Sequence, residues 1–510
     1  MRNKIGALKM VACAAFLALS VAAIWLSSNS KISAFETSAN EPENPQNCAA
    51  CHQENYDSWH RTAHRKTVRK AAPEIVRGDF ERENILEDDG VKVEMTRDGD
   101  DFYIKIGDQS YRVESVVGGK YIEQYVARKN GELYSLPIGY NLNERRWINL
   151  NDADFAGRDA DFSRHWRNWK TDCAACHRSG ENDWRDGFDS FGISCGACHG
   201  NAAEHAASKN SVWAKLGFQT ANKIVNPRDL SSDASMAACA NCHAREAKEP
   251  LKPAEIAAGQ SFDSFIPAHR QTAADSEKYR SNGASRFSGS EFQSILRSVC
   301  YVQSKSGGGG IAGEKINCAS CHSQHEKDAE LPAAKSSNRN CIQCHAEFSD
   351  DAAIVEHTKH PLNSEAGSCV SCHQPETVYG RMRFTRTHEI SVPNPVLTAE
   401  KQIPNACNLC HTDRSVNWAI ASSKQFWAER FRAAETSSDK QFDRPEGVRA
   451  LSSNDAFRRA LAADSLRKHS DANWSAPFLR EAYQTENSSL VRYFLAGVLK
   501  NDVPNSPAVR

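Results

Sequence analysis

Cys173-Ala174-Ala175-Cys176-His177 is one copy of the C-x-x-C-H motif that decides how this chain folds. The motif occurs eight times and uses 16 of the 18 cysteines in the 510 residues. Its copies are Cys48-Cys51-His52, Cys173-Cys176-His177, Cys195-Cys198-His199, Cys239-Cys242-His243, Cys318-Cys321-His322, Cys341-Cys344-His345, Cys369-Cys372-His373 and Cys407-Cys410-His411.

This spacing is typical of covalent c-type haem attachment. Two thiols add to the vinyl groups of one porphyrin, and the adjacent histidine becomes the proximal iron ligand. A thioredoxin-like redox motif would occur once, near a βαβ pattern. A zinc site would pair two C-x-x-C units without a histidine after each of them. The sequence therefore predicts eight covalent haem c groups.

Eight haems in about 364 residues imply that porphyrins replace much of the usual side-chain core. We expect a mainly α fold, in which short helices and irregular loops pack around the haems. The region 85–150 differs: alternating apolar residues such as Val91, Val93 and Met95, together with Asp98-Gly99 and Asn130-Gly131, predict a small inserted antiparallel β-domain.

The predicted organisation has five parts. They are a signal peptide or N-terminal anchor (1–34), a first haem segment (35–84), the β-domain (85–150), a multihaem core (151–415) and a C-terminal helical segment of the HEAT type (416–510). Within the last part, periodic apolar residues predict helices over 418–433, 457–466, 478–483 and 490–499.

The N-terminus indicates export. Arg2, Lys4 and Lys9 precede an uncharged, largely apolar run over 10–26, which fits either a cleaved signal or an uncleaved anchor. Both alternatives place the body outside the cytoplasm: in the periplasm, anchored to the membrane and facing the periplasm, or outside the cell. The net charge of −1 argues against nucleic acid as a partner.

Function depends on the sixth coordination position of each iron. An iron with histidine on both faces can only pass electrons, whereas an iron with an open face can transform a small molecule. Ten histidines lie outside the motifs. The candidate distal ligands are His64, His165, His205, His269, His325, His357, His360 and His388.

Two histidines remain after that assignment. His60 lies four residues before His64, on the same helical face, and is expected to hydrogen-bond rather than to ligate. His469 is expected on the surface. Cys300 is an unpaired thiol in an exported chain, and either a small buried side chain or a group near a haem face explains it. No catalytic residue is assigned; Cys300 and His60 are the weak candidates.

Several motifs resemble those of multihaem c-type cytochromes in the cytochrome c-554/c-prime superfamily, especially members that end in helical repeats. The similarity rests on Trp59 followed by His64, on Cys195 to Gly200 followed by His205, and on Pro404-Asn405-Ala406-Cys407 to His411 followed by Trp418. The resemblance implies distal roles for His64, His205, His325, His360 and His388. His269 has no counterpart in that family.

Three functions fit these observations. The first is an exported electron carrier between a membrane quinol-linked donor or periplasmic cytochromes and a terminal acceptor. The second is a haem-dependent oxidoreductase that converts a small nitrogen or sulfur compound at one open haem. The third is a structural or filament-forming cytochrome. The difference between the first two depends on a single histidine, because eight or nine ligands are available for eight irons.

Overall fold

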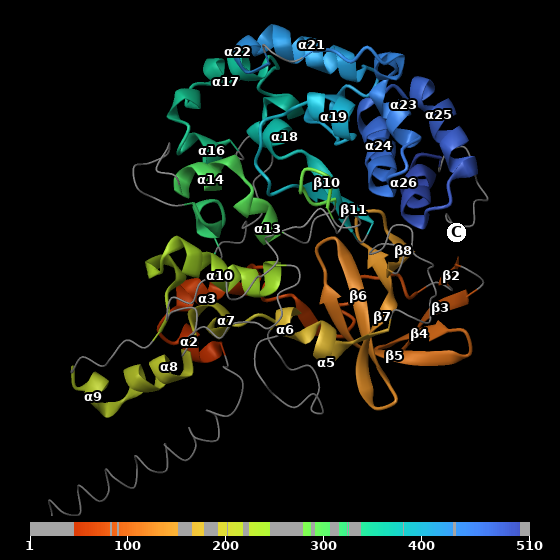
Figure 1. Cartoon of the computed structure of the whole chain (residues 1–510). Coiled ribbons are helices and arrows are strands. Elements are labelled where there is room, and N and C mark those ends of the chain that lie inside the picture. The colour runs from red at the N-terminus through yellow and green to blue at the C-terminus, as the bar shows by residue number, and fades with distance from the viewer. Residues whose placement is uncertain are drawn as a thin grey trace, which may run out of the picture.

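The computed structural model describes residues 45–499 except 82–83, 89–90, 151–165, 178–191, 201, 218–223, 245–278, 287–290, 306–315, 324, 326–337, 381 and 432–434. Figure 1 shows three regions: a β-sheet body, an arc of short helices, and a group of longer helices at the C-terminal end. In the described chain, no helix has the length and apolar character needed to cross a membrane. The predicted export segment, 1–34, lies outside the described residues.

The β-sheet body is a single antiparallel sheet. Its main path runs in sequence order from β2 to β8, and its end strands β2 and β8 contact each other, so the sheet nearly closes into a barrel. The strands are β1 (Val68–Lys70), β2 (Asn84–Asp88), β3 (Val91–Asp98), β4 (Asp101–Ile106), β5 (Gln109–Gly118), β6 (Ile122–Lys129), β7 (Glu132–Asn141), β8 (Arg146–Asn149) and β9 (Arg167–Asn168).

The sequence pattern accounts for this sheet. Val93, Met95 and Ile104 point into the barrel and are fully buried, as the alternation predicts. Asn130 and Gly131 both adopt positive φ (51° and 84°), the conformation that a tight turn between twisted strands requires. The antiparallel strands that the alternation predicts are present, with β2 to β8 running from Asn84 to Asn149.

The sheet is larger than the sequence predicts. β1 pairs with β5, and β9 pairs with β7, although both strands lie outside 85–150. Strands of three and two residues are too short to show a period of two, which is why the pattern missed them. The fold is therefore mixed, with a nine-stranded sheet beside the helices, rather than mainly α.

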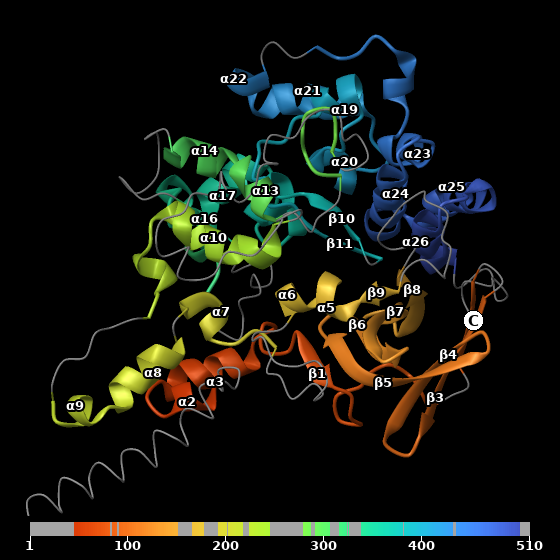
Figure 2. The ribbon, with the colours of Figure 1, turned by 60° about the horizontal axis from the view of Figure 1, so that its bottom comes forward.

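The helical arc carries the motifs. Figures 1 and 2 show it rising from α6 and α10 through α14, α16 and α17 to α19, α21 and α22. The motif elements are α2 (Gln46–Ala49), α6 (Ala174–His177), α7 (Gly196–His199), α10 (Ser232–His243), η4 (Cys318–Ser320), α16 (Arg339–Ile342), α18 (Cys369–His373) and α20 (Ala406–Cys410).

Other short elements connect the motifs. The helices are α3 (Gln53–Arg61), α5 (Trp169–Asp172), α8 (Ala202–Asn210), α9 (Val212–Lys215), α13 (Glu291–Leu296), α14 (Val299–Lys305), α17 (Asp351–Thr358), α19 (Val396–Lys401), α21 (Val416–Phe426) and α22 (Ala428–Phe431). A hairpin, β10 (Glu376–Gly380) with β11 (Arg383–Arg386), and 3-10 turns η2 (Pro227–Asp229), η5 (Ala346–Phe348), η6 (Glu365–Gly367) and η7 (Lys440–Asp443) complete the region.

The C-terminal helices close the arc onto the sheet. They are α23 (Glu446–Leu451), α24 (Ala456–His469), α25 (Ala472–Thr485) and α26 (Ser489–Leu499), and they include the segments predicted over 457–466, 478–483 and 490–499. The helix predicted over 418–433 instead breaks at Trp427, between α21 and α22.

One apolar cluster joins these helices to the rest of the chain. Leu466 and Leu495 of the helices share it with Ile148 and Leu150 from the end of the sheet and with Val378 of the β10–β11 hairpin. Tyr493 adds a polar contact, because its hydroxyl accepts a hydrogen bond from Asn141 Nδ2 at 2.8 Å. The C-terminal helices therefore pack on the end of the sheet and on the β10–β11 hairpin.

Candidate haem-binding sites

Each C-x-x-C-H motif forms one helical turn. In motif 48–52 the histidine N–H donates to the carbonyl of the first cysteine at 2.8 Å. The same bond occurs at 3.1 Å in 173–177, 2.9 Å in 195–199, 3.0 Å in 318–322, 2.9 Å in 341–345 and 2.8 Å in 407–411. Because residues three and four apart share a helical face, the turn presents both thiols and the imidazole on one side.

Six motif histidines each face a second histidine from another part of the chain. Their ring centres are 5.9–6.4 Å apart. The pairs are His52–His205 at 6.4 Å, His243–His64 at 6.3 Å, His199–His325 at 5.9 Å, His322–His388 at 6.2 Å, His373–His357 at 6.1 Å and His411–His360 at 6.0 Å.

This separation fits one metal ion between two imidazoles. Metal–nitrogen bonds of about 2.0–2.1 Å on opposite faces, with the depth of both rings added, put the ring centres about 6.3 Å apart. Every pair lies close to that value. The residues present therefore fit a haem iron held by two histidines, with the neighbouring thiols placed to attach its porphyrin.

Several of these rings are oriented by their second nitrogen. The Nδ1 atom of His199 lies 3.0 Å from the Val225 carbonyl oxygen, and the Nδ1 atom of His373 lies 2.9 Å from the Ser391 carbonyl oxygen. His360 Nδ1 lies 2.6 Å from the Thr358 carbonyl. A carbonyl at Nδ1 fixes the proton there and leaves Nε2 free to bind metal.

Burial keeps other rings of these pairs in the form that binds iron. Burial lowers the pKa of His64 and of His388, and the neighbouring motif histidine lowers the pKa of each ring further. Burial likewise lowers the pKa of His325, His357 and His411. A lowered pKa favours the neutral imidazole, which is the state that coordinates metal.

The segment that carries His64 is held against two other motifs. The Trp59 indole donates to the Ile193 carbonyl at 3.0 Å, and the Ile193 N–H donates to the His64 carbonyl at 3.0 Å. The Thr67 hydroxyl donates to the His177 carbonyl at 2.8 Å. These bonds place the segment beside motifs 173–177 and 195–199, and its histidine faces a third motif, 239–243.

Two motif histidines have their expected partners outside the described residues. Among the described rings, no histidine faces His177 or His345 at this distance. His165 and His269, the two remaining distal candidates, both fall in undescribed stretches. Six of the eight predicted distal histidines therefore lie opposite a motif histidine.

The weak catalytic candidates have different surroundings. His60 is exposed on α3, and its ring packs against Tyr56 and Trp59 at 5.7 and 6.2 Å rather than against a motif histidine. Cys300 is half-buried in α14, and burial raises the pKa of its thiol. It lies beside Cys344, and like every cysteine in the described chain it is outside any disulfide.

Comparison with known proteins agrees with this chemistry. The family described as cytochrome c554 and c-prime matches residues 47–92, which contain the first motif and His64. The family described as a doubled CXXCH motif matches residues 310–350, which contain motifs 318–322 and 341–345. The chain is a multihaem c-type cytochrome. Its C-x-x-C-H motifs attach several covalent haem c groups, and like other c-type cytochromes it is extracytoplasmic.

The fold of this cytochrome has a solved counterpart. The crystal structure of outer cell wall cytochrome OcwA superimposes with a TM-score of 0.52 over 89% of this chain and 98% of that one, at 16% sequence identity. At this identity the similarity concerns the fold alone. No curated protein matches the chain significantly.

Motifs distant in sequence meet through their cysteines. The Cys176 and Cys242 side chains lie next to each other, and Cys176 Sγ lies 3.8 Å from the Asn241 carbonyl oxygen. The Cys239 side chain lies next to that of Cys318. The cytochrome thus brings attachment atoms of different motifs into contact, which the sequence alone does not reveal.

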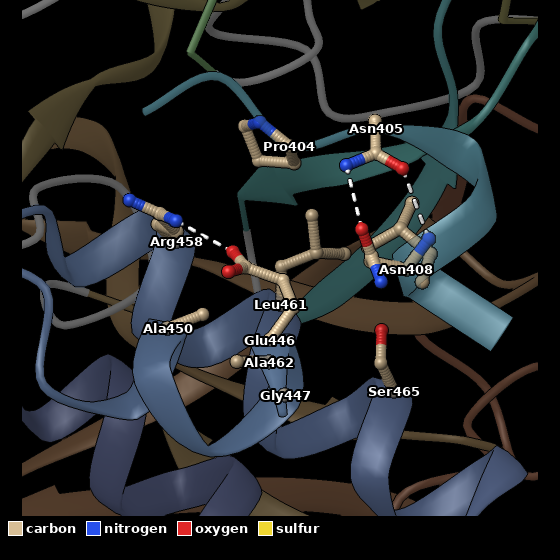
Figure 3. Close-up of a pocket in the computed structure, with 11 residues that line it drawn as sticks. Pro404, Asn405, Asn408, Glu446, Gly447, Ala450, Arg458, Leu461, Ala462 and Ser465 are labelled. Atoms are coloured by element: carbon tan, nitrogen blue, oxygen red, sulfur yellow. Dashed lines mark hydrogen bonds and ion pairs between the residues drawn. The ribbon is translucent and has the colours of Figure 1, made fainter. Parts of the chain in front are cut away.

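A small cavity lies beside motif 407–411. It is lined by residues of α20, α23 and α24, and Figure 3 shows Asn405, Asn408, Glu446 and Arg458 on its walls. Its volume of about 20 Å³ is enough for about one water molecule. The cavity therefore belongs to the packing of motif 407–411 on the C-terminal helices. In the same motif, the centre of the His411 ring lies 4.9 Å from that of the Trp418 ring.

Proposed function

We propose that this cytochrome is an exported octahaem electron carrier whose irons are held by two histidines each. The observation that carries the proposal is the six histidine pairs with ring centres 5.9–6.4 Å apart. A haem iron with both axial positions taken by histidine exchanges electrons without binding a substrate. The chain's own part is to orient the imidazoles and exclude other ligands.

The two remaining motifs are assigned by elimination. Motifs 173–177 and 341–345 need a second histidine, and His165 and His269 are the two distal candidates without a described partner. We assign these two histidines to these two motifs. His60 is then not needed as a ligand, in agreement with its exposed position against Tyr56 and Trp59.

The contacts between motifs support a relay. An electron carrier with many centres needs its centres close together. The Cys176–Cys242, Cys239–Cys318 and Cys341–Cys369 contacts place attachment atoms of different motifs side by side. The chain therefore provides a series of adjacent sites rather than isolated ones.

Location and partners follow from export and redox chemistry. The predicted N-terminal segment supports a periplasmic protein, released or anchored to the membrane. The fold shared with OcwA, an outer cell wall cytochrome, supports the extracellular alternative. The partners are redox proteins: a membrane quinol-linked donor or periplasmic cytochromes on one side and a terminal acceptor on the other. Nucleic acid is not among them, given the net charge of −1.

The second candidate is a haem-dependent oxidoreductase that converts a small nitrogen or sulfur compound. The observation that favours it is the surroundings of motif 341–345. The thiol of Cys300, which is outside any disulfide, lies near Cys344 of this motif. An open iron at this motif would have a thiol nearby.

Spin state decides between the two functions. We expect the purified, fully oxidised protein to contain eight haems by mass spectrometry and haem assay. Its electron paramagnetic resonance (EPR) spectrum should show only low-spin signals. A high-spin signal equivalent to one haem would overturn the pure carrier in favour of the oxidoreductase. Fewer than eight haems would overturn the stoichiometry.

A further inference from the structure

One short turn connects three attachment motifs. The segment 338–345 begins with Asn338, which is 7% exposed and directly precedes α16. Asn338 Nδ2 donates to the Gly367 carbonyl at 3.1 Å, and its Oδ1 accepts the Cys369 N–H at 2.8 Å. Both ends of a single buried amide are therefore used to hold the start of motif 369–373.

The opposite side of the same turn holds motif 318–322. Gln343 Nε2 donates to the Ser320 carbonyl at 2.9 Å, and Asn340 Nδ2 donates to the Cys321 carbonyl at 3.3 Å. Both amides form exposed hydrogen bonds, unlike that of Asn338. Motif 341–345 therefore lies between the two other motifs, and its buried connection is to motif 369–373.

The attachment atoms meet at that buried connection. The side chains of Cys341 and Cys369, the first cysteines of their motifs, lie next to each other. The Gly367 backbone that receives Asn338 is itself tightly packed: a Cβ at this position would lie 2.5 Å from the Leu362 carbonyl oxygen. The Gly367 carbonyl thus has little freedom to move, and it fixes where the Asn338 amide sits.

We infer that Asn338 is a positioning residue that holds attachment sites 341–345 and 369–373 side by side. The inference rests on the proposed function, since it concerns how two of the haem sites approach each other. Asn338 does not touch the reacting atoms. It acts through the backbone N–H of Cys369, which fixes the first thiol of that motif against Cys341. The Asn338 amide thereby links motif 341–345 to motif 369–373, the next motif along the chain.

The test compares variants of the full, haem-loaded protein. Asn338→Ala removes both hydrogen bonds, and Asn338→Asp keeps the oxygen that accepts from Cys369 but loses the donor to Gly367. Asn473→Ala is the matched control, because Asn473 is an exposed asparagine on α25, outside the segment 338–373. For each variant, haem content is counted, and magnetic interaction between neighbouring irons is measured by EPR of the oxidised protein.

We expect Asn338→Ala to keep its full haem content and low-spin state. The EPR signal from magnetically isolated irons should rise in Asn338→Ala by the equivalent of one pair of haems. It should rise to an intermediate extent in Asn338→Asp and not at all in Asn473→Ala. Unchanged magnetic interaction in a fully loaded Asn338→Ala protein would overturn the inference. If that variant loses haem, a loaded Asn338→Asp protein with the parent spectrum would overturn it instead. A high-spin signal in the parent would refute the proposed function and not this inference.

Discussion

The buried ion-pair network beside motif 407–411 allows a quantitative prediction. Glu446, 5% exposed, accepts from Arg458 Nη2 and from Arg449 Nε, both at 2.6 Å, and Arg458 is 2% exposed. Burial lowers the pKa of Arg458 and the Glu446 carboxylate raises it, so the carboxylate offsets part of the cost of burying the charged guanidinium. Glu446→Gln removes the carboxylate charge and leaves two guanidinium groups facing a neutral amide.

The expected loss of stability follows from burial. Removing one partner of a buried ion pair costs about 3–5 kcal/mol, and we take the lower end because glutamine keeps one acceptor oxygen. For a cooperative unit of about 150–250 residues, each kcal/mol lowers Tm by about 2–4 °C, so Glu446→Gln should lower it by about 6–12 °C.

Thermal unfolding followed by far-UV circular dichroism measures this change, with haem content as a check on loading. Glu356→Gln is the control, because Glu356 forms an exposed pair with Lys359 and should have no measurable effect. A Tm within about 2 °C of the parent in Glu446→Gln would refute this reasoning, since one kcal/mol alone shifts Tm by about 2–4 °C.

Three further predictions concern the sites and the sheet. His357→Ala and His360→Ala should each convert one haem to the high-spin state in the EPR spectrum and the double variant two, whereas His60→Ala should convert none; a low-spin double variant would contradict the pairing. Burial raises the pKa of Glu123, so its contribution to stability is fully present below about pH 4.5 and is lost as pH rises through the raised pKa. Denaturant unfolding of Glu123→Gln should therefore lack this pH dependence, and a parent-like profile would exclude it. Because burial also raises the pKa of Cys300, the native thiol should react slowly with iodoacetamide at neutral pH, and rapid labelling would show a thiolate instead.

The sequence by itself determined the chemistry of this protein. The eight C-x-x-C-H motifs identify haem attachment because thiols two residues apart and the adjacent histidine share one helical turn, a local property that needs no tertiary information. The β-domain over 85–150 and the C-terminal helices were equally predictable, since Val93 and Met95 alternate and the residues over 490–499 repeat with helical periodicity. The candidate distal histidines could also be named, because subtracting the motif residues leaves only ten.

Only the tertiary structure decided which histidine faces which motif. His205 follows motif 195–199 in sequence yet faces His52, and His64 faces His243, far along the chain. No local pattern encodes such pairs, because each depends on how several short segments pack around a shared centre. The same holds for Asn338, because the sequence does not show that its amide lies beside Gly367 and Cys369. Haem attachment is determined by residues within one helical turn. Which histidine becomes the second ligand, and how far apart the sites lie, depend on long-range packing.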